Sequence, residues 1–331
     1  MPLDSQERLL IARRKLRSLL HLLDEDQTAT FNDGPGSGIN NGSIYWVLDD
    51  EENLGRTLDR SVLELTNNEH LDLIIFYEDI DAARVASRRA NFLHPAPKIY
   101  LISEGKKIPV EPALQQIRPK IASVEPTKEF ENLCLGADLK TVFESGIWRG
   151  EILGLEVVRL SEGKVEVGVG KFDREAGLIM NAGRSLAEVL HAATEIVKSQ
   201  RQPGKGFHPL STLVRERWLR SEALLNPSSL DFESMEPIDP PEERLSLRDS
   251  ASSAAMAKDK DGADVLVIFS VGVDIRIFSF IADLLFLESP DRVEVIMPKK
   301  DIFKPITQIL NKFVVPISVM GVRGPWEVED I

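Results

Sequence analysis

Cysteine is nearly missing from this chain, which has Cys134 alone among 331 residues. One thiol excludes an internal disulfide and excludes a metal site built from several thiolates. We therefore expect Cys134 to be a small buried apolar residue, the common role of a free cysteine.

Long apolar runs are also missing. The longest, near 73–77, 265–269 and 275–287, are too short or too charged to span a bilayer. The opening MPLDSQERLL has early acids and no apolar run, so we expect no signal peptide. Together with the low cysteine content, these features predict a soluble cytoplasmic protein with no membrane partner.

Catalytic signatures are missing as well: the sequence holds no nucleophile elbow, HExxH, CxxC or Walker pattern. The glycines of segment 25–43 follow a predicted helix and precede a predicted strand. A phosphate-binding loop needs the opposite order, because the N-terminus of the following helix supplies much of the anion binding. We interpret 25–43 as a Gly-rich linking loop, and whether the protein is an enzyme stays open.

Basic residues are outnumbered, with 40 Lys and Arg against 53 Asp and Glu and a formal net charge of −13. A field of this sign repels phosphate backbones, so sequence-independent nucleic-acid binding is disfavoured. Segment 226–263 is rich in Pro and Ser and holds nine acids against four bases. This composition is typical of a flexible linker, which could also engage protein partners.

Alternating apolar segments predict an α/β fold with two strand–helix units. In the first unit, 44–126, we expect strands at 44–48, 71–77 and 98–103, followed by a Pro-rich connection. The second unit, 264–331, repeats the alternation. Strands and helices that alternate at this spacing imply parallel strands.

The two units are predicted to flank a central helix–β-hairpin–helix module at 127–225. Its helices are expected at 127–145, 185–201 and 209–225, and Ser185 with Glu188 predicts a capping box. An amphipathic helix at 1–24 precedes the first unit.

The central hairpin, residues 150–175, is predicted to turn at Glu162-Gly163. A two-residue turn there pairs positions whose numbers sum to 325. This register opposes Arg159 to Glu166 and Glu151 to Arg174 on one face, as two cross-strand ion pairs.

Glu156 falls on the opposite face, which is otherwise apolar. A carboxylate on such a face must be paired or change its protonation state, and Lys171 is the natural partner. Asp173 follows two positions later. Structural ion pairs, a polar ligand site and metal-dependent hydrolysis are the open interpretations of these three residues.

Two carboxylates and a lysine at the end of a hairpin resemble the active site of the PD-(D/E)XK nucleases, over about residues 127–201. The resemblance implies that Glu156 and Asp173 bind a divalent metal, Mg²⁺ or Mn²⁺. It also implies that Lys171 orients the attacking water. The lysine of the family's E-x-K tripeptide would fall at Gly168.

Further candidates for ligand binding lie around the hairpin and at two helix starts. Glycines within a strand mark a bulge or a close approach by a backbone or ligand, and arginines beside an aromatic residue can grip a carboxylate or phosphate. The Gly272 loop joins a strand to a helix, where Asp274 is expected as the N-cap. The candidates are Arg174, Glu175, Gly168, Gly170, His208, Arg217, Arg220, Gly272 and Asp274.

The sequence therefore predicts a protein that binds a small ligand or regulates a protein partner. The alternative is a divalent-metal-dependent phosphodiesterase, similar to a nuclease, that uses the hairpin carboxylates and lysine.

Overall fold

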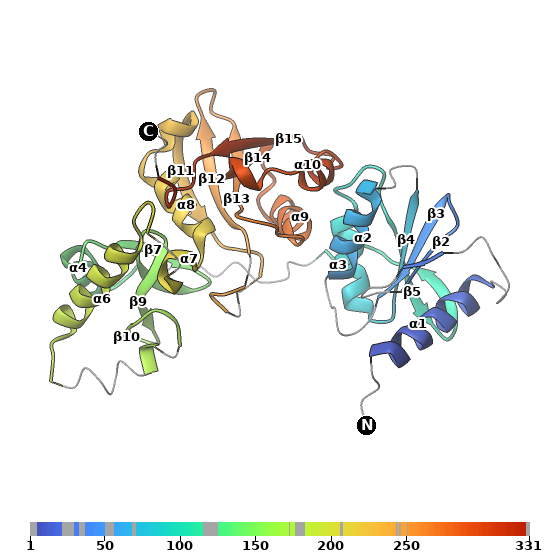
Figure 1. Ribbon diagram of the computed structural model, residues 1–331, viewed down its shortest axis with the longest axis horizontal. Helices are drawn as coiled ribbons and strands as arrows, with labels where there is room; N and C mark the ends of the chain where they lie inside the picture. Colours follow the sequence, from blue (N-terminus) through green and yellow to red (C-terminus); the bar gives the residue numbers. More distant parts are fainter. Residues whose placement is uncertain are drawn as a thin grey trace. The chain divides into compact units, whose positions relative to one another are not determined.

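The computed structural model shows a mixed α/β fold, the class that the sequence predicts. It describes residues 5–21, 30–32, 37–49, 56–67, 71–114, 125–171, 173–175, 183–205, 208–242, 244, 246–249 and 251–328. These residues form three sheets (Figure 1). The chain divides into two compact units, and each unit combines segments that are distant in sequence. Unit 1 comprises Met1–Gln116, Ile275–Leu287 and Phe303–Ile317, and unit 2 comprises Ile117–Asp274, Glu288–Ile302 and Ser318–Ile331.

Unit 1 is built on one sheet whose strands lie in sequence order. The strands are β1 (Thr30–Asn32), β2 (Ser37–Asn40), β3 (Ile44–Leu48), β4 (Asp72–Tyr77), β5 (Lys98–Ser103) and β6 (Lys106–Pro109). β3, β4 and β5 are the three predicted strands, and they pair in parallel as expected. The expected linking loop at 25–43 is wrong in part, since it contains the antiparallel strands β1 and β2. Gly38 makes room there for the Tyr45 ring, which a Cβ would approach to 2.5 Å.

Helices cover both faces of this sheet. α1 (Ser5–Leu20) packs Leu16 against Leu48 and Phe76, while α2 (Arg56–Asn67) and α3 (Ile80–Ala90) lie on the other side (Figure 1). The C-terminal helices α9 (Ile277–Glu288) and α10 (Lys304–Leu310) also fall in this unit. Buried Asp283 of α9 accepts hydrogen bonds from Arg88 and Arg89 of α3, at 3.0 and 2.6 Å. Charge-assisted bonds of this kind fix α9 on α3.

Unit 2 contains a second sheet in the order β11-β12-β13-β14-β15. Its strands are β11 (Phe232–Ile238), β12 (Ser253–Asp259), β13 (Asp264–Phe269), β14 (Arg292–Pro298) and β15 (Ile317–Val322). β13 and β14 pair in parallel, as predicted for the C-terminal strands. The first three strands are antiparallel.

The prediction of a flexible linker at 226–263 is wrong, because this segment supplies a 3-10 helix, η2 (Pro227–Leu230), and the strands β11 and β12. Phe232 and Met235 are buried in one apolar cluster with Ala255 of β12, while Glu233 between them is exposed. On β11 the acids Glu233 and Glu236 are exposed while the apolar residues face the core, and average composition does not reveal that pattern.

The third sheet, also in unit 2, is an antiparallel meander in the order β10-β9-β8-β7. It consists of β7 (Lys140–Glu144), β8 (Ile147–Ile152), β9 (Leu155–Ser161) and β10 (Lys164–Val167). The predicted register is confirmed between β9 and β10, where Arg159 lies opposite Glu166 and Val158 opposite Val167.

Two predicted elements of the module are wrong in their extent. The helix expected at 127–145 ends early, as α4 (Lys128–Gly136), and β7 follows it. The first long strand of the hairpin is two strands, because the chain turns at Leu153 and Gly154, both with positive φ. A side chain at Gly154 would collide with the backbone of Arg217, so the turn is packed directly on the helix that contains Arg217, α8 (Arg215–Leu225).

Helices complete the module. α6 (Leu186–Gln200) has the predicted capping box between Ser185 and Glu188. The helix expected at 209–225 is divided into α7 (Pro209–Thr212) and α8 (Arg215–Leu225). Arg201 explains the division. Its guanidinium donates hydrogen bonds to the carbonyls of Leu210 and Leu213, which would otherwise accept backbone hydrogen bonds in a continuous helix.

The core of the module forms between α4, α6 and the meander. Cys134, Leu155 and Leu190 are fully buried in it, as expected for the cysteine. Burial raises the pKa of the Cys134 thiol to about 11. None of the helices in the described part of the chain has the length and apolar character needed to cross a membrane.

Candidate functional site

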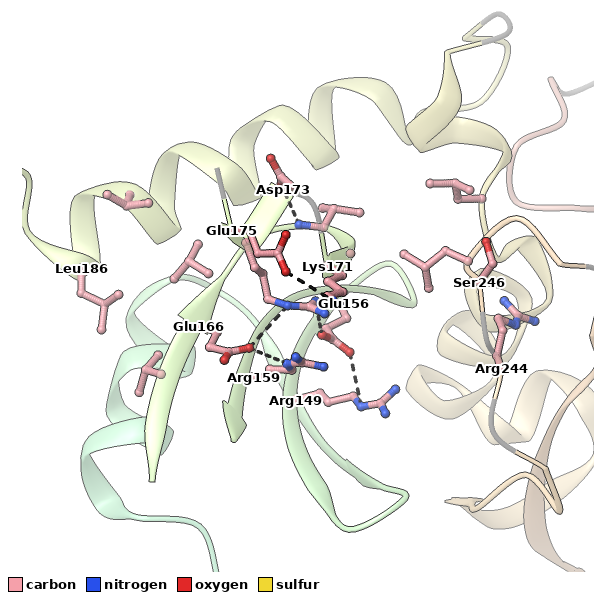
Figure 2. A pocket seen from close by; sticks show the side chains of 18 of the residues that line it. Arg149, Glu156, Arg159, Glu166, Lys171, Asp173, Glu175, Leu186, Arg244 and Ser246 are labelled. Carbon is pink, nitrogen blue, oxygen red and sulfur yellow. Dashed lines mark hydrogen bonds and ion pairs between the residues drawn. The ribbon is translucent and has the colours of Figure 1, made fainter. Parts of the chain in front are cut away.

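A pocket of about 1010 Å³ lies in unit 2, beside β9 and β10 (Figure 2). Its wall combines strands β8, β9 and β10, described residues of 169–175, the start of α6 and Arg244, Ser246, Leu247 and Arg248. Most of its lining side chains are charged. Among the described residues, the basic ones are Arg149, Arg159, Lys171, Arg174, Arg184, Arg244 and Arg248, and the acidic ones are Glu156, Glu166, Asp173 and Glu175.

Ion pairs order one side of this pocket. Glu156 accepts a hydrogen bond from Arg174 at 2.9 Å and lies 3.3 Å from Nε of Arg149. Glu166 pairs with Arg159 at 2.8 Å and with Arg174 at 3.5 Å. Figure 2 shows these side chains as one connected cluster. We call Arg149, Glu156, Arg159, Glu166 and Arg174 the charged wall.

A sharp turn at Gly168 brings Arg174 into the charged wall. Gly168 has φ +144°, and a Cβ there would lie 2.7 Å from the backbone nitrogen of Arg174. The carboxylate of Asp173 accepts a hydrogen bond from the Val169 N–H at 2.7 Å. The close neighbour of Gly168 is therefore the backbone of Asp173 and Arg174, and ligand binding at this glycine stays a prediction.

This turn makes one predicted ion pair wrong. Arg174 was expected opposite Glu151 on a continuous strand, but β10 ends at Val167. Arg174 instead returns toward β9 and meets Glu156. Glu151 lies opposite Glu156 on the neighbouring strand and pairs with Arg217 at 3.6 Å.

Glu156, Lys171 and Asp173, the predicted catalytic residues, all line the pocket but do not pair as expected. Glu156 has arginine partners in place of Lys171. The Lys171 side chain is 78% exposed and lies 3.9 Å from the Glu175 carboxylate. In the part of the chain that the structure describes, no group of three or more His, Cys, Asp and Glu side chains could hold a metal ion. Metal-dependent hydrolysis stays a prediction.

Two further candidates, Arg217 and Arg220, lie inside the protein. Their side chains are only 8% and 2% exposed, and both pair with the buried carboxylate of Glu144. Arg149 joins the same carboxylate at 3.1 Å. Burial alone would raise the pKa of Glu144, but Arg217, Arg220 and Arg149 together hold it at about 2. Burial by itself would lower the pKa of Arg217. The carboxylates of Glu144 and Glu151 outweigh this effect, so the pKa of Arg217 is raised.

His208, Gly272 and Asp274 have local structural contacts outside the pocket. Nδ1 of His208 accepts a hydrogen bond from Leu210 N–H at the start of α7. Gly272 N–H donates to Asp301 at 2.8 Å. Asp274 is buried and accepts a hydrogen bond from the Ser252 hydroxyl at 3.3 Å. The prediction that Asp274 caps the next helix is wrong, since α9 begins at Ile277.

The remaining candidates lie in the lining. Glu175 pairs with Lys171. Gly170, with φ +81°, stands opposite Leu247, whose Cδ1 would lie 3.5 Å from a Cβ at that glycine. This distance is an ordinary van der Waals contact, so the positive φ and not crowding is what favours glycine at position 170.

Segment 244–248 supplies the lining residues that the sequence did not predict. Arg244 is the most informative of them, because its side chain is only 8% exposed. One nitrogen, Nη2, binds the carboxylate of Glu216 and the carbonyl of Ala251. Its other terminal nitrogen, Nη1, is buried and has no hydrogen-bond partner among the described residues. The sequence signal that could have indicated this site is the pair Arg244 and Arg248, four residues apart in an otherwise acidic segment.

Comparisons with known proteins give this pocket no precedent. No family model matches the chain, and neither a curated protein nor a solved structure matches it.

Proposed function

We propose that the protein binds a small anionic molecule in this pocket. Seven basic side chains line it against four acidic ones among the described residues, although the whole chain carries a net charge of −13. A local reversal of sign in a concave site concentrates anions there and repels cations. Such a pocket supports a ligand-binding or regulatory role.

The observation that carries the proposal is the Nη1 atom of Arg244, which is buried and lacks a hydrogen-bond partner within the described part of the chain. A buried N–H without an acceptor loses its hydration and gains nothing in return, at a cost of about 1–3 kcal/mol. A guanidinium is suited to carboxylate and phosphate oxygens, because its donors match their geometry. A bound anion would supply the acceptor that this nitrogen lacks.

The pocket also has the size of a ligand site. Small-molecule sites usually enclose about 300–1,000 Å³, and the volume of about 1010 Å³ falls at the upper end of that range. The charged wall is held by its own ion pairs, so much of the site is formed before a ligand arrives.

A thermal-shift screen of the full chain tests the proposal. The panel contains phosphate, citrate, ATP and decanoate, with glucose and spermidine as neutral and cationic controls. We expect at least one anion to raise the melting temperature by several degrees, because a ligand at 100 times its Kd stabilises by about 2.7 kcal/mol.

Two variants locate the effect. Arg248→Gln removes an exposed base of the pocket, and Lys128→Gln makes the same change at an exposed base outside it. The shift should shrink in Arg248→Gln and persist in Lys128→Gln. Equal loss in both variants, or flat responses to every anion, would refute the proposal.

A further inference from the structure

Apart from Gly170 and Ser246, the uncharged lining residues of the pocket are aliphatic. They include Val165 and Val167 on β10 and Leu186 and Val189 on α6, together with Leu247. These side chains are not fully buried, so each leaves apolar surface toward solvent or the pocket. No aromatic residue is found among the lining residues that the structure describes. Nucleobases are commonly held by stacking on aromatic side chains, and this lining offers aliphatic surface instead.

Leu186 and Arg244 lie on opposite sides of the pocket. Figure 2 shows Leu186 on one side of the view and Arg244 with Ser246 on the opposite side. Arg248 belongs to the same short segment as Arg244, and Ser246 accepts a hydrogen bond from its backbone N–H at 3.2 Å. The segment around Arg244 thus presents donors for an anion, and Leu186 of α6, across the pocket, presents apolar surface.

We infer that the ligand is an aliphatic anion, an apolar chain with a carboxylate or phosphate head group. The head group binds at Arg244 and Arg248, where it supplies the acceptor for the buried Nη1 atom. The chain lies along Val165, Val167 and Leu186, where its burial removes apolar surface from water. This inference rests on the proposed function, since it requires an anion in the same pocket.

Calorimetric titration of the full chain separates the contributions of head group and chain. The probes are decanoate, decyl phosphate, decanol, acetate, inorganic phosphate and ATP, all below micelle-forming concentrations. We expect decanoate or decyl phosphate to bind at least tenfold more tightly than acetate, inorganic phosphate, decanol or ATP. The comparison between the two decyl anions distinguishes a carboxylate head group from a phosphate.

Matched variants place the chain and the head group. Leu186→Ser should weaken binding of the preferred decyl anion at least fivefold, while Ile196→Ser, at another exposed aliphatic residue of α6 outside the pocket, should leave it unchanged. Arg244→Met tests the head group. Because Arg244 also pairs with buried Glu216, Arg248→Gln at the exposed neighbour is the second head-group variant.

Three results overturn the inference. If ATP or inorganic phosphate binds as tightly as the decyl anions and Leu186→Ser has no effect, the ligand is a polar anion and the proposed function stands. If decanol matches decanoate, the head group does not contribute and the inference fails. If no anion binds, both the inference and the proposed function fail.

Discussion

The Nε atom of Arg149 lies 3.3 Å from a carboxylate oxygen of Glu156, and this ion pair joins the charged wall to the interior of unit 2. The same guanidinium contacts buried Glu144 at 3.1 Å. Arg217 and Arg220 surround that carboxylate from α8. A continuous series of alternating charges therefore runs from the pocket to the core, so changes at Glu144 and in the pocket should be coupled.

Substitution Glu144→Gln should strongly destabilise unit 2. It removes the shared partner of Arg217 and Arg220, two arginines whose side chains are almost fully buried. Removing one partner of a buried ion pair typically costs about 3–5 kcal/mol, because an uncompensated charge remains. Urea unfolding followed by circular dichroism measures the loss.

The matched control is Glu166→Gln in the charged wall. Its carboxylate is 34% exposed, so water screens the pairs with Arg159 and Arg174. Exposed pairs contribute about 0.2–1 kcal/mol, and we expect a loss in that range. Equal losses for the two substitutions would contradict the central role of Glu144.

The stability difference between the wild type and Glu144→Gln should depend on pH. Burial raises the pKa of Glu144 but its three arginines lower it further, to about 2. An unfolded glutamate titrates near about 4.3. Since the folded pKa is below the unfolded one, this stabilisation is fully present above the unfolded pKa and is lost as pH falls through the folded pKa.

Urea unfolding of both proteins between about pH 6 and pH 3 measures this dependence, which follows from the two pKa values. The difference in unfolding free energy should shrink steadily below about pH 4.3. A difference that stays constant over this interval would show that Glu144 is not held ionised by its arginines.

Substitution Gly168→Ala should destabilise the turn that carries Arg174. The added Cβ would lie 2.7 Å from the Arg174 backbone nitrogen, and φ is +144°. A strained backbone conformation of this kind costs about 1–3 kcal/mol. Gly136→Ala is the control, because it has no atom within 4 Å and ends α4. Helix propensity makes that change neutral or stabilising by up to about 1 kcal/mol. Equal effects on the urea midpoint would refute the packing role of Gly168.

Divalent-metal binding can be tested at the residues that resemble a nuclease site. Both oxygens of Glu156 are engaged, one by Arg149 and the other by Arg174, so a metal ion would have to break both pairs. We therefore expect calorimetry with Mn²⁺ to give the same result for the wild type and Asp173→Ala, with no saturable binding that depends on Asp173. Saturable Mn²⁺ binding that is lost in Asp173→Ala would instead support the phosphodiesterase.

Local patterns in the sequence predicted much of the secondary structure. The apolar runs gave β3, β4 and β5, and the capping box at Ser185 placed the start of α6. The helix breaks and turns were missed, because they depend on groups distant in sequence. Arg201 donates a hydrogen bond to the Leu213 carbonyl, where α7 ends. The backbone of Arg217 lies so close to residue 154 that only glycine fits there.

The site was predicted in part for the same reason. The register of β9 and β10 depends on a short turn, and it correctly placed Arg159 opposite Glu166. The partners of Glu156 come from a separate strand and from a turn that folds back at Gly168. Arg244 was missed because its segment had the composition of a linker, and its partners, Glu216 of α8 and the carbonyl of Ala251, come from outside that short segment.

The most direct test of the central claim is hydrogen–deuterium exchange of the full chain, with and without the anion that binds most tightly. Bound ligand should slow amide exchange at the elements it contacts, because they open less often. We predict protection concentrated in 164–171 and 246–249, reduced in Arg248→Gln and retained in Lys128→Gln. The account is contradicted if saturating anion leaves exchange in 164–171 and 246–249 unchanged and instead protects other segments of unit 2, or only unit 1. The anion would then bind outside this pocket.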